Sequence, residues 1–187
     1  SIVAWYGDAD YKEDGSMGNQ VGDWTDIVDL DHSNRELWNY HFETLKLWAD
    51  IVDGARCDVA PLLPIEFWNE ARAEVAKVNP NFIWLAESIE RHFLQDLRAE
   101  GVLAHSDAEV FQAFDLSYDY DVYLEFRDYI KGDAPLSKYV HMLNIQDSSY
   151  PENYIKMKFL ENHDQDRAAS FITNPNDLMQ WTAFNYL

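Results

Sequence analysis

Residues 53–87 read DGARCDVAPLLPIEFWNEARAEVAKVNPNFIWLAE, and they carry the pattern of a strand, a helix and a second strand. A short segment at 53–58 is followed by Pro64, which suits the first turn of a helix whose apolar residues recur every three or four positions. The sequence NPN at 79–81 ends that helix, and a continuous apolar segment follows at 82–87. This order predicts two parallel strands joined by a right-handed crossover.

The same alternation extends to both sides of this stretch. Before it, Ser33 and Glu36 match a capping box, and a helix over 34–51 is predicted to bury one face made of Leu37, Tyr40, His41, Leu45, Trp48 and Val52. After it, the predicted elements are a helix at 89–100, a strand at 114–118, helices at 121–131 and 136–145, a strand at 157–162 and a helix from about 175.

These elements predict an α/β protein with a parallel sheet. Both a doubly wound sheet and a (β/α) barrel fit the pattern, although no glycine-rich phosphate loop follows any predicted strand. Residues 1–31 are rich in Gly, Asp and Asn without a steady period, which indicates an irregular loop or small subdomain before the α/β part at 32–187. The final residues WTAFNYL lie inside a helical pattern, so we expect both ends of the chain to be cut from a longer domain.

Composition excludes several classes of partner. The formal net charge is −20 and no cluster of Lys and Arg is present, which argues against nucleic acid and against anionic membranes. Cys57 is the single cysteine, so no internal disulfide can form. No apolar run in the sequence approaches transmembrane length.

Ionisable and polar side chains stand at the ends of three predicted strands: Arg56 with Asp58, then Glu87, then Asn162 with His163 and Asp164. The carboxyl ends of parallel strands meet at one edge of the sheet, where active sites of such folds lie. Because side chains alternate along a strand, Arg56 and Asp58 share one face. We therefore expect these groups to lie close together.

Two carboxylates in unlike surroundings are suited to cleaving a glycosidic bond with retention of configuration. A guanidinium beside Asp58 favours its ionised, nucleophilic form, whereas the apolar strand before Glu87 favours a protonated general acid. Each motif also has a simpler interpretation: a structural ion pair for Arg56 and Asp58, a charge at a helix start for Glu87, and a capped loop for 162–164. An unrelated α/β domain would not bring Asp58 and Glu87 together.

At these residues the chain resembles the α-amylase family of glycoside hydrolases, which have a (β/α)8 barrel. GARCDVA resembles the motif of the fourth barrel strand, WLAES that of the fifth, and FLENHDQDR that of the seventh, in the family's order. DWTDIVDLDHSN resembles the short motif where the loop subdomain rejoins the barrel. The resemblance implies a partial barrel covering about strands four to seven, preceded by the end of a subdomain at 1–31.

The resemblance also implies roles for the residues that match the motifs. Asp58 would be the nucleophile, Glu87 the acid/base, and Asp164 a stabiliser of the transition state. Arg56 would orient Asp58, and His163 and Asn162 would contact substrate. The expected activity is that of a retaining glycoside hydrolase acting on α-linked glucans or maltooligosaccharides, without a cofactor. Alternatives are a transglycosylase or glucoside isomerase of the same family, or a non-catalytic binding module.

Several positions depart from the family's pattern. Many members carry an aromatic residue where Ala55 stands and a Lys-His pair where Pro61 and Leu62 stand. In those members that region helps to bind a calcium ion, so these departures argue against a calcium site in this chain. Asp29 is either a remaining calcium ligand or an exposed loop residue. A half barrel has two open sheet edges, so we expect the isolated chain to self-associate and to have little or no hydrolytic activity.

Overall fold

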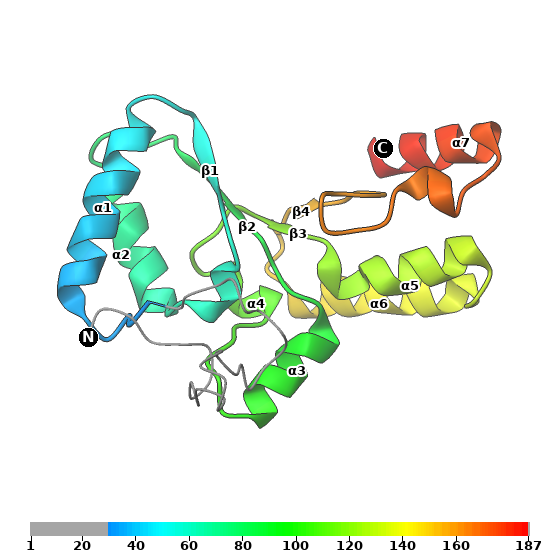
Figure 1. Cartoon of the computed structure of the whole chain (residues 1–187), viewed down its shortest axis with the longest axis horizontal. Coiled ribbons are helices and arrows are strands. Elements are labelled where there is room, and N and C mark those ends of the chain that lie inside the picture. The colour runs from blue at the N-terminus through cyan, green and yellow to red at the C-terminus, as the bar shows by residue number, and fades with distance from the viewer. Residues whose placement is uncertain (1–29, 187) are drawn as a thin grey trace, which may run out of the picture.

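A computed structural model describes residues 30–186 of the chain (Figure 1). Four strands form one parallel sheet: β1 (Gly54–Cys57), β2 (Ile83–Ala86), β3 (Leu116–Tyr118) and β4 (Lys156–Met157). Their order in the sheet is their order in the chain, β1-β2-β3-β4. Every crossover adds its strand to the same edge, whereas the strand order of a doubly wound sheet reverses at a switch point. The described residues therefore form part of a (β/α) barrel.

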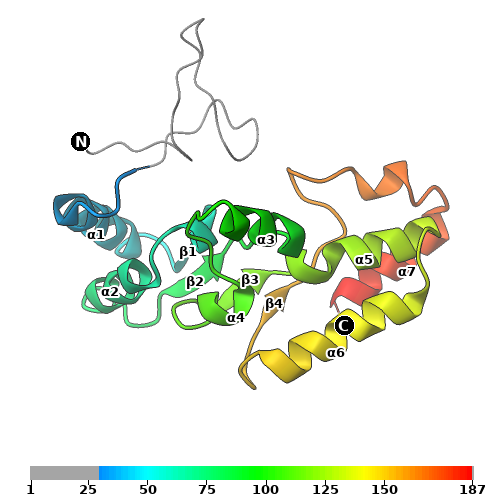
Figure 2. The same ribbon diagram turned by 90° about the horizontal axis from the view of Figure 1, so that it is seen from below.

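Seven α-helices accompany the strands in the described part of the chain: α1 (Arg35–Ala49), α2 (Ile65–Val75), α3 (Arg91–Ala99), α4 (Asp107–Val110), α5 (Tyr120–Lys131), α6 (Leu136–Ser149) and α7 (Pro175–Tyr186). Two 3-10 turns lie at Ala60–Leu62 and Ala168–Ser170. Figure 2 shows α1 and α2 toward the β1 edge of the sheet and α5, α6 and α7 toward the β4 edge, with α3 and α4 between them.

The helix-facing side of the sheet forms the main core. Ala55 and Cys57 of β1 and Trp84 and Ala86 of β2 alternate with residues of the opposite face and pack into one apolar cluster. Helices α1 and α2 contribute aromatic and small side chains to it: Trp38, Phe42, Ala49, Phe67, Trp68, Ala71 and Val75. Burial of these large rings is a main source of stability, at about 25 cal/mol per Å² of apolar surface removed from water.

The opposite side of the sheet corresponds to the interior of the barrel. The register pairs Arg56 with Leu85 and Tyr118 with Met157, so these side chains point to this side. Tyr118 forms a second apolar cluster with Leu85, Met157 and the tyrosines of α5. Arg56 is thus a charged residue placed among apolar strand positions on the inner face, as the sequence alternation predicts.

Three local predictions are wrong. The cap of α1 is Asn34, whose side chain accepts the Glu36 amide, while the Ser33 hydroxyl donates to Asp31 Oδ1 instead. The buried face of α1 comprises Trp38, Phe42 and Ala49, and the predicted face residues Tyr40 and Trp48 are exposed. The strand predicted at 157–162 is reduced to Lys156–Met157, because residues after it leave the ladder.

Residues 1–29 lie outside the described part of the chain. The subdomain predicted at 1–31 therefore stays a prediction except at positions 30 and 31, and so does the role of Asp29 as a ligand. The α/β part predicted at 32–187 contains all the strands and helices described above. Among the described helices, none combines the length and the apolar composition needed to cross a lipid bilayer.

Candidate active site

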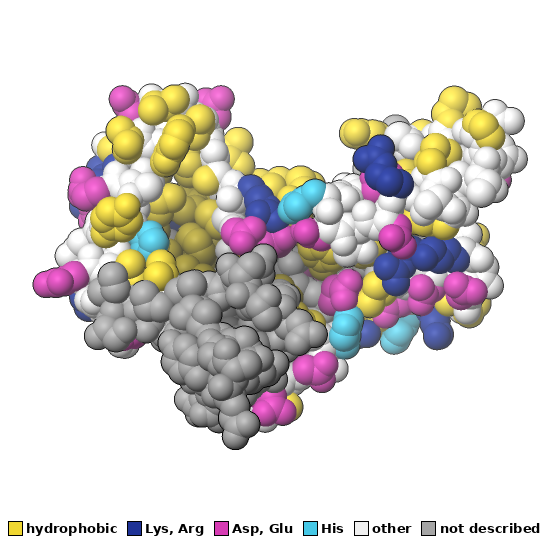
Figure 3. Space-filling view, in the orientation of Figure 1, with side chains coloured by type: hydrophobic (Ala, Val, Ile, Leu, Met, Phe, Trp, Pro, Cys, Tyr) yellow, Lys and Arg dark blue, Asp and Glu magenta, His cyan; other side chains and the backbone are white. Residues whose placement is uncertain are grey.

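A pocket of about 620 Å³ opens at the carboxyl ends of the strands. Its lining includes the three predicted carboxylates, Asp58, Glu87 and Asp164, together with His163. The remaining lining residues come from the segments after β1, β2 and β4 and from the start of α5: Val59, Ser88, Ile89, Glu90, His92, Phe93, Tyr120 and Gln165. In the space-filling view, acidic, basic and histidine side chains gather near the centre of the molecule (Figure 3).

Arg56 joins the first two carboxylates. Its Nη1 donates to Asp58 Oδ1, and its Nη2 lies 2.5 Å from Glu87 Oε1 as an ion pair. The guanidinium also lies over the Tyr118 ring, 5.6 Å from its centroid. The expected contact between Arg56 and Asp58 is therefore present, and Glu87 shares the same cation.

The two carboxylates differ in their exposure to solvent. The Asp58 side chain is 68% exposed, whereas that of Glu87 is 13% exposed. Burial raises the pKa of Glu87 above its ordinary value, and the nearby Asp58 charge acts in the same direction. The Val59 amide and the Arg56 guanidinium oppose this rise in the pKa of Glu87. The surroundings of Glu87 thus favour its protonated form, as a general acid requires.

The backbone after Asp58 is bent so that it contacts Glu87. Val59 adopts φ 43° and ψ 38°, the left-handed region that β-branched residues rarely occupy. In this conformation its amide donates to Glu87 Oε2 at 2.8 Å, and the Glu87 amide donates to Cys57 O at 3.0 Å. The segment carrying Asp58 and the segment carrying Glu87 are therefore held together by backbone contacts as well as by Arg56.

The third segment lies across the pocket, after β4. His163 Nε2 is 3.1 Å from Asp164 Oδ2, and both side chains are at least half exposed. Asn162 does not line the pocket; its Nδ2 donates to the Tyr120 hydroxyl at 2.7 Å, and its Oδ1 accepts the Asp164 amide at 2.9 Å. Asn162 is thus placed to orient the loop that carries Asp164, whereas the substrate contact predicted for it stays a prediction.

Sequence reasoning did not single out Tyr120 or Ser88. Tyr120 is 6% exposed and borders the pocket at the start of α5, and Ser88 follows Glu87 directly and is 1% exposed. Ser88 belongs to the WLAES motif, but a serine after a strand has no chemical signature of its own. The Tyr120 hydroxyl accepts a hydrogen bond from Asn162 in the segment after β4, and this tertiary contact has no signal in the sequence.

The departures at Pro61 and Leu62 offer no side-chain oxygen for a calcium ion. Leu62 packs with Leu97 and Ala104, and the Pro61 carbonyl accepts the His105 amide at 2.8 Å. Among the described residues, no group of three or more His, Cys, Asp or Glu could hold a metal ion. The side chains of Pro61 and Leu62 therefore do not fit a calcium site of that kind.

A parallel sheet wound as part of a (β/α) barrel, with charged side chains gathered at the carboxyl ends of its strands, is the layout of a barrel enzyme. Comparison with known proteins narrows this class. No family model matches the chain. The chain is 25% identical over 165 residues to the α-amylase MalA of Haloarcula japonica, covering 86% of this chain and 23% of that protein. It is 24% identical over 161 residues to the cyclomaltodextrin glucanotransferase of Niallia circulans, covering 85% of this chain and 21% of that protein.

Among solved structures, an α-amylase from Lactobacillus plantarum superposes with a TM-score of 0.87 and is 44% identical, covering 95% of this chain and 42% of that one. The chain therefore spans less than half the length of these relatives. These matches identify it as a part of the catalytic barrel of the α-amylase family of glycoside hydrolases.

Proposed function

We propose that this chain carries the catalytic groups of a retaining hydrolase of α-linked glucans. Asp58 is the nucleophile, Glu87 the general acid and base, and Asp164 binds sugar hydroxyls beside the reacting carbon. The observation that carries the proposal is that these three carboxylates, from the segments after β1, β2 and β4, line one pocket. α-Glucans and maltooligosaccharides are the proposed substrates because the relatives are named as α-amylases and a cyclomaltodextrin glucanotransferase.

In the first step Glu87 gives its proton to the glycosidic oxygen, and the bond from the anomeric carbon to that oxygen breaks. An Asp58 oxygen forms a bond to the same carbon, which leaves a glycosyl-enzyme ester and a free sugar. The contact with Arg56 places a positive charge beside the attacking Asp58 oxygen. Burial of Glu87 favours the protonated form that supplies the proton.

In the second step the Glu87 carboxylate takes a proton from water, and the water oxygen bonds to the anomeric carbon. The ester bond to Asp58 breaks, and Asp58 returns to its carboxylate form. Arg56 contacts both carboxylates, so it stabilises Asp58 when that group leaves and Glu87 when that group has lost its proton. Two inversions at one carbon give net retention.

The test measures hydrolysis of maltooligosaccharides by the 187-residue chain and by a complete barrel, in which this chain replaces the matching stretch of the Lactobacillus plantarum α-amylase. We expect little or no turnover from the chain alone, since its sheet edges are open, and enzymatic turnover from the complete barrel. In the complete barrel, Glu87→Gln lowers kcat by about 10²–10⁴-fold, the range for a lost acid–base group. Asp58→Asn and Asp164→Asn also lower kcat.

Two matched substitutions serve as controls. Glu90→Gln removes the fourth carboxylate of the pocket lining, which has no role in the proposed mechanism, and Asp53→Asn changes an exposed carboxylate at the other end of β1. Both are expected to leave kcat within about threefold, as they leave the proposed chemical step intact. Near wild-type hydrolysis in Asp58→Asn, Glu87→Gln or Asp164→Asn would remove that residue from the mechanism.

The likeness to a cyclomaltodextrin glucanotransferase favours transglycosylation as a second candidate. It uses the same glycosyl-enzyme, which a sugar hydroxyl resolves in place of water. Product analysis on maltose and starch separates the two: hydrolysis gives only shorter sugars, and transfer gives products longer than the starting sugar.

A further inference from the structure

We propose that Ser88 is a positioning residue for Glu87, which it holds in place by anchoring the end of β2 to the Tyr118 carbonyl. This inference rests on the proposed role of Glu87. Ser88 is 1% exposed, and its Oγ donates to Tyr118 O at 2.7 Å. Ser88 directly follows Glu87, so anchoring the Ser88 hydroxyl restrains the backbone that carries the Glu87 carboxylate.

The sheet ladder stops just before these residues. Strand β2 ends at Ala86, which pairs with Ser117 as the last register position between β2 and β3. Glu87 and Ser88 therefore lack the ladder contacts to β3 that fix the residues before them. The Ser88 hydroxyl extends the link between β2 and β3 by one further step, at the point where the proposed acid leaves the strand.

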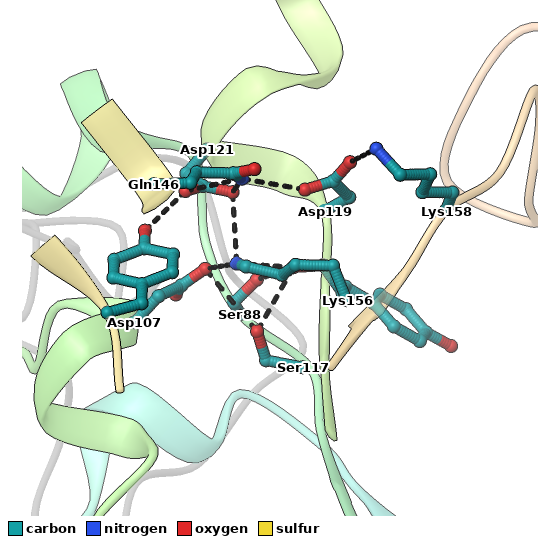
Figure 4. A network of polar contacts seen from close by, with 10 residues as sticks. Ser88, Asp107, Ser117, Asp119, Asp121, Gln146, Lys156 and Lys158 are labelled. Carbon is teal, nitrogen blue, oxygen red and sulfur yellow. Dashed lines mark hydrogen bonds and ion pairs between the residues drawn. The ribbon is translucent and has the colours of Figure 1, made fainter. Parts of the chain in front are cut away.

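The Tyr118 carbonyl is itself held in place by a buried cluster of charges. Lys156 Nζ donates to Tyr118 O at 3.2 Å and to Asp121 Oδ1 at 3.0 Å, and it also contacts Asp107 Oδ2. The Lys156 side chain is 3% exposed, and its partners come from β3, α4 and α5. Figure 4 shows Ser88 beside this cluster.

A third helix secures the same cluster. Gln146 of α6 donates from Nε2 to Asp119 Oδ1 at 2.8 Å and to Asp121 Oδ1 at 3.0 Å, and Lys158 Nζ lies 3.4 Å from Asp119 Oδ2 (Figure 4). Residues 118–121 are thus fixed from several directions. The Ser88 hydroxyl transmits this rigidity to the backbone of Glu87.

The hydroxyl is not needed merely to satisfy the Tyr118 carbonyl. That oxygen already accepts from Lys156 Nζ at 3.2 Å, so it keeps a donor without Ser88, and the Ser117 hydroxyl, which also contacts Asp107, lies 3.3 Å away. Ser88 nevertheless makes the shortest of the three contacts. Losing it leaves the carbonyl paired and frees the segment that carries Glu87.

The kinetic test compares two substrates in the complete barrel described above. In Ser88→Ala we expect the first-turnover rate and kcat on maltooligosaccharides to fall about tenfold, with KM within about twofold, because a displaced Glu87 is a poorer acid for the leaving oxygen and a poorer base for water. On α-glucosyl fluoride, whose leaving group needs no such proton, fluoride release in the first turnover stays within about threefold of wild type, while kcat falls because hydrolysis of the glycosyl-enzyme still needs Glu87 as the base. Ser88→Thr, which keeps the hydroxyl, restores at least part of the loss.

The control is Ser148→Ala, which removes an exposed serine-to-carbonyl hydrogen bond of 3.0 Å in α6, at a residue that does not line the pocket. Ser148→Ala is expected to leave the rates on both substrates unchanged. An equal loss in the first turnover of both substrates in Ser88→Ala, or no loss in the first turnover of either, would overturn the positioning role. If Ser88→Ala does not fold, Ser88→Cys, of similar size but a weaker donor, is judged by the same comparison.

A spectroscopic test on the 187-residue chain does not depend on activity. The Val59 amide donates to Glu87 Oε2, so its ¹H–¹⁵N resonance reports where that carboxylate lies. Glu87→Gln gives the shift for a changed carboxylate contact. Ser88→Ala should move the Val59 resonance in the same direction, and Ser148→Ala should leave it in place. An unmoved resonance in Ser88→Ala contradicts positioning, whereas full activity of Glu87→Gln contradicts the proposed function alone.

Discussion

Arg56 Nη2 lies 2.5 Å from Glu87 Oε1 while Nη1 of the same guanidinium donates to Asp58. One cation thus contacts the exposed carboxylate that is proposed to attack and the buried one that is proposed to give the proton. The planar fork of arginine can reach two carboxylates at once, which the single ammonium group of lysine does less well. This relationship explains why a charged residue occupies an inward position of β1.

The first prediction concerns Arg56→Lys. The Arg56 charge lowers the pKa of Glu87, so weakening that contact should raise the pKa further. A general acid is active while protonated, and the alkaline limb of the kcat/KM profile should therefore move to higher pH, with a lower maximum. The profile is measured in the complete barrel, with Arg35→Lys, which alters an exposed pair with Glu70, as the control. A limb that moves to lower pH would contradict the assignment of Glu87 as the acid.

The second prediction concerns the buried cation. Lys156→Met leaves Asp107 and Asp121 without their cation and should cost about 3–5 kcal/mol in the free energy of unfolding. Chemical denaturation of the 187-residue chain measures this loss. Lys77→Met, which removes an exposed pair with Glu74, is the control and should have little effect.

The loss in Lys156→Met should also depend on pH. Burial raises the pKa of Asp107 to about 6, against the attraction of Lys156, so removing Lys156 raises it further. A folded-state pKa above the unfolded value means that stability is lost as pH rises through it. The difference in unfolding free energy between wild type and Lys156→Met should therefore be greater at pH 8 than at pH 5. A difference independent of pH would show that Asp107 does not couple to this lysine.

The third prediction uses the left-handed backbone of Val59. Val59→Ala and Val59→Gly lose the same packing against the cluster around Leu97, but only glycine adopts φ 43° without a penalty. Val59→Gly should therefore be more stable than Val59→Ala by about 1 kcal/mol. The same pair of substitutions at Val140, inside α6, should give the opposite order. If the alanine variant is more stable than the glycine variant at both positions, the backbone strain at Val59 is refuted.

The fourth prediction concerns association of the isolated chain. Helix α1 exposes Tyr40, Leu47 and Trp48, and Ile51 beyond its end is 66% exposed, so this side is apolar and uncovered (Figure 3). Light scattering should show oligomers of the 187-residue chain, and Leu47→Glu combined with Trp48→Glu should shift it toward the monomer. Glu36→Gln, at the other end of α1, is a neutral control. A wild-type monomer at assay concentration would contradict this expectation.

Much of the architecture follows from the sequence. Short apolar strand segments and the helices between them predict a parallel sheet, and polar side chains at strand ends predict which groups meet. The face of α1 was not predictable from spacing alone, because Trp38 and Tyr40 both fit a helical stripe and only packing against α2 selects Trp38. The cap failed similarly: Ser33 and Asn34 are both good caps, and Asp31 takes the Ser33 hydroxyl.

The parts of the site that depend on tertiary contacts could not be predicted from the sequence. Lys156 appears in the sequence as an ordinary residue near a strand, yet its partners Asp107 and Asp121 are 49 and 35 positions away. The left-handed Val59 has no sequence signal, since valine disfavours that conformation. The Lys156 cluster and the left-handed Val59 both lie next to the segment of Glu87, a residue that the sequence does indicate.

The central claim is that Asp58 and Glu87 act on the same anomeric carbon, and covalent trapping tests it most directly. In Glu87→Gln of the complete barrel, α-glucosyl fluoride can still load the nucleophile because fluoride leaves unaided, while release of the sugar lacks its base. Peptide mass spectrometry should therefore find a hexosyl group on Asp58, absent from Asp58→Asn/Glu87→Gln. A hexosyl group on a different residue, or steady hydrolysis with no adduct in either protein, would contradict the account.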